Sequence, residues 1–191
     1  MRILIVCLCF LYTFNACSQQ KSIANEENTD TINDDVLLKD SVRLSPGKLY
    51  EQAKRAYEEG YYSKAVHLCD QVISLDSSFT AAFYTRALIK DDMGNLEEAI
   101  RDYTIVIQRN PKHSVAYVNR GGGYMVLGNY SAGLKDMDKA IEINPNTKVG
   151  YFNRGNIYEL FGESEKACAD WQKAADLGHQ KAAIEVEKNC K

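Results

Sequence analysis

The sequence predicts an all-α solenoid in which four helix pairs stack one after another, because one pattern recurs at a fixed spacing. The run at 117–121 has close copies at 83–87 and at 151–155, one step upstream and one step downstream. Two further columns keep the same step: the glycines Gly60, Gly94, Gly128 and Gly162, and the small residues Ala65, Ala99, Gly133 and Ala167. A fixed period of about 20 to 50 residues is typical of repeat architectures.

Each repeat divides into two expected helices around its glycine. Glycine adopts the left-handed conformation after a helix C-terminus at little cost, so it should end each first helix. Asn110-Pro111 and Asn144-Pro145 should end second helices, because the residue before proline avoids the helical region. The expected pairs are 47–59 with 63–75, 81–93 with 97–109, 115–127 with 131–143, and 149–161 with 165–177. Asn95 and Glu98 have the spacing of a capping box.

Residue size predicts how the two helices of a repeat cross. Small residues on the first helices should face small residues on the second, at Ala53, Ala87, Gly121 and Gly155 against Ala65, Ala99, Gly133 and Ala167. Bulky residues should fill the column Cys69, Tyr103, Met137 and Trp171. Close packing explains Gly121 but not Gly122, which we interpret as leaving room for a ligand backbone or as mere tolerance.

A recurring charge pair is predicted to join the two helices of each later repeat. Arg86, Arg120 and Arg154 recur on first helices, and Asp102, Asp136 and Asp170 recur at a constant distance behind them on second helices. In the first repeat both columns change together, to Gln52 and Leu68. Pairing within a repeat leaves no charge single, so we predict Arg86–Asp102, Arg120–Asp136 and Arg154–Asp170.

The pattern, with its period of about 34 residues, resembles the tetratricopeptide repeat, a helix–turn–helix unit. The resemblance covers roughly residues 46–181, with repeats at about 46–79, 80–113, 114–147 and 148–181. It implies a right-handed superhelical solenoid within a domain over 46–191, closed by a capping helix over 180–190. A terminal cap is needed because the last pair otherwise exposes its stacking face. Ala182, Ala183, Ile184 and Val186 are expected to cover it.

The resemblance also implies a binding groove. In this family the first helix of each pair lines a concave face that binds peptides or partner helices. Matched column by column, the lining residues here are Tyr50, Lys54, Tyr57, Tyr84, Leu88, Asp91, Val118, Asn119, Gly122, Met125, Phe152, Asn153, Asn156 and Glu159. The Lys and Arg set with which family members hold a C-terminal carboxylate is missing, so a chaperone-tail ligand is not expected. Alternatively, some of these residues only cover one another or the N-terminal segment.

The N-terminus predicts export and a lipid anchor. Arg2 precedes the apolar run 3–12, which is too short to span a membrane and is typical of a signal peptide over 1–16. Ala16-Cys17 resembles the lipobox of bacterial lipoproteins, which implies lipidation of Cys17, and the following Ser implies the outer membrane. The alternative is an ordinary secretory signal that leaves Cys17 a free thiol. Residues 17–45 are predicted to form a disordered tether, although 36–38 are apolar enough to dock on the first repeat.

The remaining cysteines predict one disulfide and one buried thiol. Cys168 and Cys190 lie at similar distances before and after Gly178, the expected turn between two antiparallel helices. In an exported chain this placement favours a disulfide, with two unlinked thiols as the alternative. Cys69 is expected to be a buried, inert thiol.

Composition and motifs predict a binding protein rather than an enzyme. The net charge of −3 argues against a nucleic-acid surface. His67, His113 and His179 lie at unrelated columns and share no metal-ligand spacing or nucleophile, so no catalytic site, metal or cofactor is expected. We therefore predict a protein-binding scaffold, anchored by Cys17 and facing the periplasm, with an unknown protein partner in the envelope. The alternatives are a glycan ligand in the aromatic groove, or repeats that serve only as a spacer.

Overall fold

The structure, a computed structural model, describes residues 44–190. The helices in this range are α2 (Pro46–Glu58), α3 (Tyr62–Leu75), α4 (Thr80–Asp92), α5 (Leu96–Arg109), α6 (Ser114–Val126), α7 (Tyr130–Ile143), α8 (Lys148–Leu160), α9 (Ser164–Asp176) and α10 (Gln180–Asn189). The expected helix pairs are confirmed to within one residue at each end. The predicted signal peptide, the anchor at Cys17, and the tether up to residue 43 with its apolar patch lie outside the described residues.

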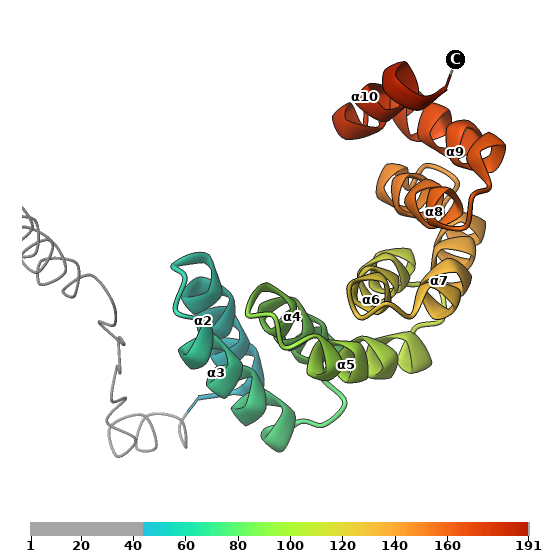
Figure 1. Ribbon diagram of the computed structural model, residues 1–191. Helices are drawn as coiled ribbons and strands as arrows, with labels where there is room; N and C mark the ends of the chain where they lie inside the picture. The colour runs from blue at the N-terminus through green and yellow to red at the C-terminus, as the bar shows by residue number, and fades with distance from the viewer. Residues whose placement is uncertain (1–43, 191) are drawn as a thin grey trace, which may run out of the picture. The chain divides into compact units, whose positions relative to one another are not determined.

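The helices stack as an all-α solenoid, which confirms the expected fold class. Each first helix packs against its own second helix, and each second helix packs against the first helix of the next repeat. Within the described residues α2, α4, α6 and α8 lie along the inner side of a curve, and the second helices lie along its outer side (Figure 1). Helix α10 packs on α9 and ends the stack.

Glycine and proline set the helix ends as expected. Gly60, Gly94, Gly128 and Gly162 have φ between 75° and 84°, the left-handed conformation that favours glycine. Helices α5 and α7 end one residue before Asn110 and Asn144. The side-chain oxygens of these two asparagines accept hydrogen bonds from the backbone two residues further on, which stabilises the turn to the next repeat.

The expected capping box at the start of α5 is wrong. Asn95 is the N-cap residue, but its side chain makes no capping hydrogen bond. The carboxylate of Glu98 instead pairs with Lys90 of the preceding helix, with Nζ and Oε2 3.0 Å apart. A charged tertiary partner thus outcompetes the backbone of the same turn. The equivalent Asn129 does cap its helix, by accepting from the backbone N–H of Ala132.

Small residues allow the two helices of each repeat to approach closely. A Cβ built on Gly121 would lie 2.8 Å from Cε of Met137 and 3.2 Å from the carbonyl oxygen of Gly133. A Cβ on Gly155 would collide in the same way with Trp171. The bulky column is buried throughout, as expected: Cys69, Tyr103, Met137 and Trp171.

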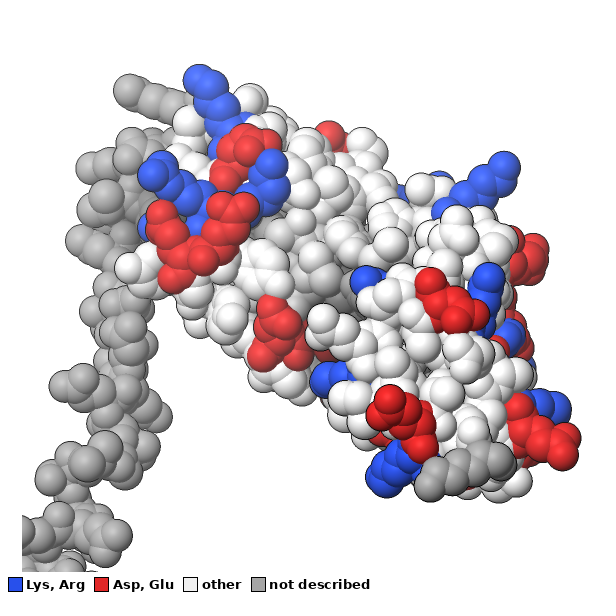
Figure 2. Space-filling model, turned by 90° about the horizontal axis from the view of Figure 1, so that it is seen from above, with Lys and Arg blue, Asp and Glu red and all other residues white. Residues whose placement is uncertain are grey.

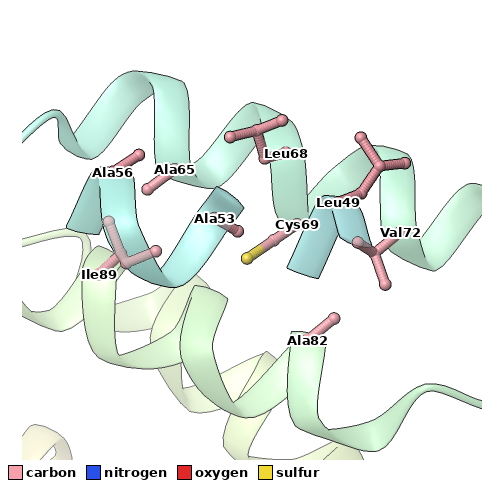
Figure 3. Close-up of a cluster of buried hydrophobic side chains, with 9 residues drawn as sticks. All are labelled: Leu49, Ala53, Ala56, Ala65, Leu68, Cys69, Val72, Ala82 and Ile89. Carbon is pink, nitrogen blue, oxygen red and sulfur yellow. The ribbon is translucent and has the colours of Figure 1, made fainter. Parts of the chain in front are cut away.

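The first repeat has an entirely apolar core. Figure 3 shows Cys69 and Leu68 of α3 packed with Ala53 of α2, while Ala82 and Ile89 of α4 lie along the same pair. The second repeat therefore helps to bury the first. Burial raises the pKa of the Cys69 thiol to about 12, so this cysteine stays protonated, as expected of an inert core thiol.

Arginine and aspartate join the helices of the three later repeats in the predicted pairs. In each pair Nε and Nη2 of the arginine donate to the two carboxylate oxygens of the aspartate, at 2.6–2.8 Å. The carboxylates of Asp102, Asp136 and Asp170 are buried. The hydrogen bonds that Arg120 donates to Asp136 raise the pKa of Arg120 despite the opposing effect of burial.

The third guanidinium nitrogen of each arginine reaches the preceding repeat, a contact that we did not predict. Nη1 of Arg86 lies 2.5 Å from Asp70, and Nη1 of Arg154 lies 2.7 Å from Asp138. In the middle repeat Nη1 of Arg120 donates to the hydroxyl of Thr104 at 3.0 Å. Each arginine therefore ties together three helices from two repeats.

Removing one member of a buried pair should be far more costly than removing a surface pair. Side chains of Arg120 and Asp136 are only 15% and 7% exposed. Asp136→Leu should lower the free energy of unfolding by about 3–5 kcal/mol, because it leaves a buried guanidinium without its carboxylate. A double-mutant cycle with Arg120→Gln, followed by urea unfolding, should give a coupling energy of at least about 1 kcal/mol.

The exposed pair Lys139–Glu142 provides the matched control for this cycle. Its coupling energy should fall in the range of about 0–1 kcal/mol. Equal coupling energies for the two pairs would contradict the assignment of the arginine as a clamp between helices.

Helix α10 covers the end of the solenoid with a narrow row of residues along one of its faces. Ala182 is buried, and Val186 and Cys190 pack against the same cluster as Trp171 and Ala174. These α10 residues lie four positions apart and so share one helix face. The expectation that Ala183 and Ile184 also cover the last repeat is wrong, because both point away from that face and are exposed.

The structure contains a disulfide between Cys168 of α9 and Cys190 at the end of α10. This is the pairing that the turn at Gly178 predicts. The bridge closes a loop with a sequence separation of 22 residues.

Reducing this disulfide should weaken the C-terminal cap. In the chain-entropy model a loop of this length contributes about 3 kcal/mol. We expect a reductant to lower the urea midpoint and to speed amide hydrogen exchange in α10. A Cys168→Ser variant, which has no bridge, should show no response to reductant. Two free thiols in mass spectra of the unreduced protein would contradict the bridge.

Candidate interaction groove

The residues expected to line the groove lie on the inner helices and are mostly half-buried. Tyr50, Lys54 and Tyr57 belong to α2, and the other candidates belong to α4, α6 and α8. Val118 is the buried exception and Glu159 is the exposed one. Partly exposed side chains on adjacent helices are what a shallow binding surface needs, because they offer contact area without first having to be uncovered.

Polar contacts link successive inner helices. The hydroxyls of Tyr50 and Thr85 are hydrogen-bonded at 3.0 Å, and Tyr57 donates to the carboxylate of Asp92 at 2.6 Å. Asn119 donates to the hydroxyl of Tyr84 at 3.4 Å. Each contact spans one repeat, with a sequence separation of 35 residues. Part of the expected groove therefore does cover itself, as the alternative interpretation proposed.

Two histidines have the same role at the margin of the groove. His113 lies against the ring of Tyr84 with centroids 4.9 Å apart, and His179 stacks on Phe152 at 4.3 Å. In each case Nδ1 accepts the backbone N–H three residues later, so both histidines cap a helix. Burial, together with Lys148, lowers the pKa of His179 and thereby favours the neutral ring that can accept this bond.

The sequence interpretation that His113 and His179 occupy unrelated positions is therefore wrong. Their separation along the chain falls two positions short of two full repeats. Helix α9 and the turn before α10 are together two positions shorter than in the preceding repeats, and this hides the equivalence. Their common signal is a histidine directly before a helix, where a side-chain acceptor satisfies a free backbone N–H.

Two expected groove residues also support the core behind them. Asn156 accepts the indole N–H of Trp171 at 2.9 Å, and Asp91 accepts the hydroxyl of Tyr103 at 3.4 Å. Burial raises the pKa of Asp91. Both side chains keep further acceptor capacity.

The free part of the groove is centred on the middle repeats. A Cβ built on Gly122 would meet no atom within 4 Å, so the α6 backbone is open there. Leu88 and Met125 are half-buried, and among the described residues Asn153 has no hydrogen-bond partner. Figure 2 shows a stretch of surface without charged side chains between charged groups to its left and right, with an acidic group along its lower side. This surface can offer apolar contacts and an amide.

The described residues provide no sign of a metal site or a membrane span. Within 44–190 no three His, Cys, Asp or Glu side chains are placed to hold a metal ion. In the same range no helix combines the length and the apolar character needed to cross a membrane.

Tetratricopeptide repeats are recognised within residues 80–169. Residues 80–113 and 115–147 match one family model described as tetratricopeptide repeat, and residues 137–169 match a second model with the same description. These models describe a repeat and no catalytic family. No curated protein matches the chain.

Solved structures with the same fold include proteins from several sources. A crystal structure of MamA aligns with a TM-score of 0.67 at 22% identity, over 72% of this chain and 81% of that one. MamA from Desulfovibrio magneticus RS-1 gives 0.68 at 19% identity, over 74% and 81%. The first repeat domain of Spaghetti (RPAP3), bound to an HSP90 peptide, gives 0.56 at 23%, over 60% and 93%. At such identities the likeness concerns the fold alone.

Proposed function

We propose that this chain is a scaffold of the bacterial cell envelope that binds a partner peptide or helix in its concave groove. A tetratricopeptide fold supports protein interaction in general. The observation that carries the proposal is the open, uncharged surface around Gly122, flanked by Leu88, Met125 and Asn153. Apolar side chains next to a free amide suit a peptide, because the apolar groups bury apolar area and the amide bonds the peptide backbone.

The chemistry of the groove favours a ligand that is not held by its carboxylates. The Spaghetti domain was solved with the HSP90 peptide SRMEEVD, in which three of the seven residues are acidic. The column at Tyr50, Tyr84, Val118 and Phe152 of this chain holds no Lys or Arg. The single groove lysine, Lys54, is paired with Glu51 at 2.8 Å.

The contacts of the aromatic rings do not favour the alternative of a glycan ligand. A sugar ring would stack on an exposed aromatic face. His113 already lies against the ring of Tyr84, and His179 covers one face of Phe152. A protein ligand is therefore the better match to the surface that remains.

Gly122→Ala should stabilise the fold and weaken partner binding. The added methyl group meets nothing inside the protein, and alanine is favoured over glycine in a helix interior by about 1 kcal/mol. The same methyl group would occupy the space where a ligand backbone approaches. The measurements are urea unfolding and quantitative recovery of partners that co-purify from solubilised envelope.

Two glycine variants act as controls for this experiment. Gly47→Ala adds a methyl group that also meets nothing, but it lies outside the middle repeats and should leave binding unchanged. Gly121→Ala should destabilise the fold, because its Cβ would lie 2.8 Å from Met137. If Gly122→Ala stabilises the protein and retains every partner, Gly122 is merely tolerated and the groove is not the binding site at this point.

The placement in the envelope is supported by the sequence and by the disulfide. The apolar run 3–12 and the Ala16-Cys17 pair suit an exported, lipidated chain. Two or more acyl chains give stable anchoring where a single chain is marginal. The bond between Cys168 and Cys190 suits an oxidising compartment, where disulfides persist.

Cys17→Ser should release the protein from membranes. The substitution removes the thiol that would carry the lipid, so the variant should move from the membrane fraction to the soluble fraction on centrifugation. Cys190→Ser, which removes a cysteine of the repeat domain, should stay with the membranes. Sedimentation of the Cys17→Ser protein with membranes would rule out this anchor.

A further inference from the structure

Large apolar side chains are exposed along one edge of the solenoid, where each first helix turns into its second helix. We define the turn ridge as Met93, Val126, Leu127, Leu160 and Phe161, which are between 41% and 74% exposed. The most exposed are Val126 at 74% and Leu160 at 61%. Isolated exposed hydrophobic residues are common, but a contiguous set marks an interaction surface.

The ridge is continuous across the third and fourth repeats. Val126 and Leu160 are one repeat period apart, as are Leu127 and Phe161, so each pair occupies the same place in successive repeats. The ring of Tyr130, at the start of α7, contacts the ring of Phe161 edge-on with centroids 6.3 Å apart. This contact joins the two turns into one surface.

The fold does not require apolar residues at these positions. The same two columns hold Glu58 and Glu59 in the first repeat, and Asp92 and Met93 in the second. Both of those repeats form the same helical hairpin. In these two columns the apolar character thus increases along the chain and is greatest in the last two repeats, so the repeat itself does not require it.

Acidic side chains lie beside the apolar residues of the ridge: Asp92 occupies the Val126 column in the second repeat, and Glu159 belongs to the adjoining groove column. Asp92 and Glu159 lie in the last turns of α4 and α8, next to Met93 and Leu160. The helix dipole disfavours negative charge at a C-terminal end, so these acids do not serve helix stability. Among the described residues Glu159 has no salt-bridge partner, and Asp92 accepts only the Tyr57 hydroxyl.

We propose that the turn ridge is a second docking surface, which adjoins the groove at Glu159, for an amphipathic helix of a partner protein. The apolar stripe of that helix would cover the ridge, and Lys or Arg beside the stripe would face Asp92 and Glu159. Positions one heptad apart on a helix are separated by about 10.5 Å. Helices α6 and α8, which end at the two turns of the ridge, contact each other directly. Neighbouring packed helices lie about 8–10 Å apart, so a heptad stripe matches the step from one repeat to the next.

The occupant of the ridge follows from its charges as well as from its apolar side chains. The two bordering acids would repel an anionic membrane surface, whereas they complement a basic helix. They also make an identical copy a poor occupant, because the same acids would then meet across a symmetric contact.

The test uses the purified full chain and a synthetic helical peptide of about 18 residues, or five turns. The peptide carries Leu at heptad spacing with Lys on the flanks, and a matched peptide carries Glu in place of Lys. Binding is measured by titration calorimetry at low and high salt. We expect the Lys peptide to bind more tightly than the Glu peptide, with an affinity that falls as salt rises.

Paired substitutions locate the binding. Val126→Ser with Leu160→Ser removes two ridge contacts and should weaken the Lys peptide by at least about tenfold. The matched control is Val115→Ser with Val149→Ser, two exposed valines that also occupy equivalent places in successive repeats, at the starts of α6 and α8. The control pair should bind as the unaltered chain does. Glu159→Gln, which keeps the size of the side chain, should weaken binding and reduce its salt dependence, while Gly122→Ala should have no effect.

Several results would overturn the proposal. These are failure of the Lys peptide to bind, equal binding of the Glu peptide, and equal weakening by the ridge pair and the control pair. Sedimentation of the chain as a dimer that the ridge pair dissociates would assign the surface to a second copy. Ridge-dependent binding to vesicles of neutral phosphatidylcholine would assign it to lipid. All altered ridge and control residues are exposed, and circular dichroism verifies that each variant keeps its helices.

Discussion

The bidentate bond between a buried aspartate and an arginine of the facing helix is the interaction on which the arrangement of the later repeats depends. A carboxylate sealed between helices has no water to replace its partner, so the arginine has one favourable position. Its remaining nitrogen then reaches the preceding repeat, which fixes one hairpin against the next. Arg86, Arg120 and Arg154 each follow a groove position by two residues. Holding the guanidinium therefore also sets the rotation at which the inner helix presents Tyr84, Val118 and Phe152.

The groove is built by contacts between repeats, and this separates the side chains that shape it from those that remain free. Tyrosine hydroxyls and an asparagine join α2 to α4 and α4 to α6, and two histidines support the aromatic rings from the turns. Asn156 and Asp91 satisfy donors from the core. What remains is a short stretch around Gly122, in which the side chains have no polar commitments. Some residues of these columns thus hold the groove in shape, and other residues of the same columns remain free to contact a ligand.

The sequence predicted the features that repeat with strict spacing and missed those that depend on a neighbour. Glycines and prolines placed the helix ends, and the joint change to Gln52 and Leu68 identified the partner of each arginine.

The contact made by the third guanidinium nitrogen of each arginine was not predicted. Its acceptors are Asp70, Thr104 and Asp138, which accept the same hydrogen bond but do not all carry a charge. The capping box failed because Lys90, on the preceding helix, competes for the carboxylate of Glu98. The equivalence of His113 and His179 was hidden by a shortened last repeat. Which groove residues remain without a partner depends on the distances between side chains. The spacing of residues along the sequence does not predict those distances.

The two ends of the solenoid are closed by different means. A repeat array behaves nearly as a one-dimensional chain of units, and such arrays lose structure by fraying from whichever end has the weaker terminal interface. At the C-terminal end the last helix is tied covalently to the helix beneath it. At the N-terminal end the first repeat has Leu68 where the others have an aspartate, and only apolar contacts join its two helices at that level. Fraying is therefore directional: it starts at α2 and proceeds toward the cap, so the third and fourth repeats are the last part of the array to lose their order.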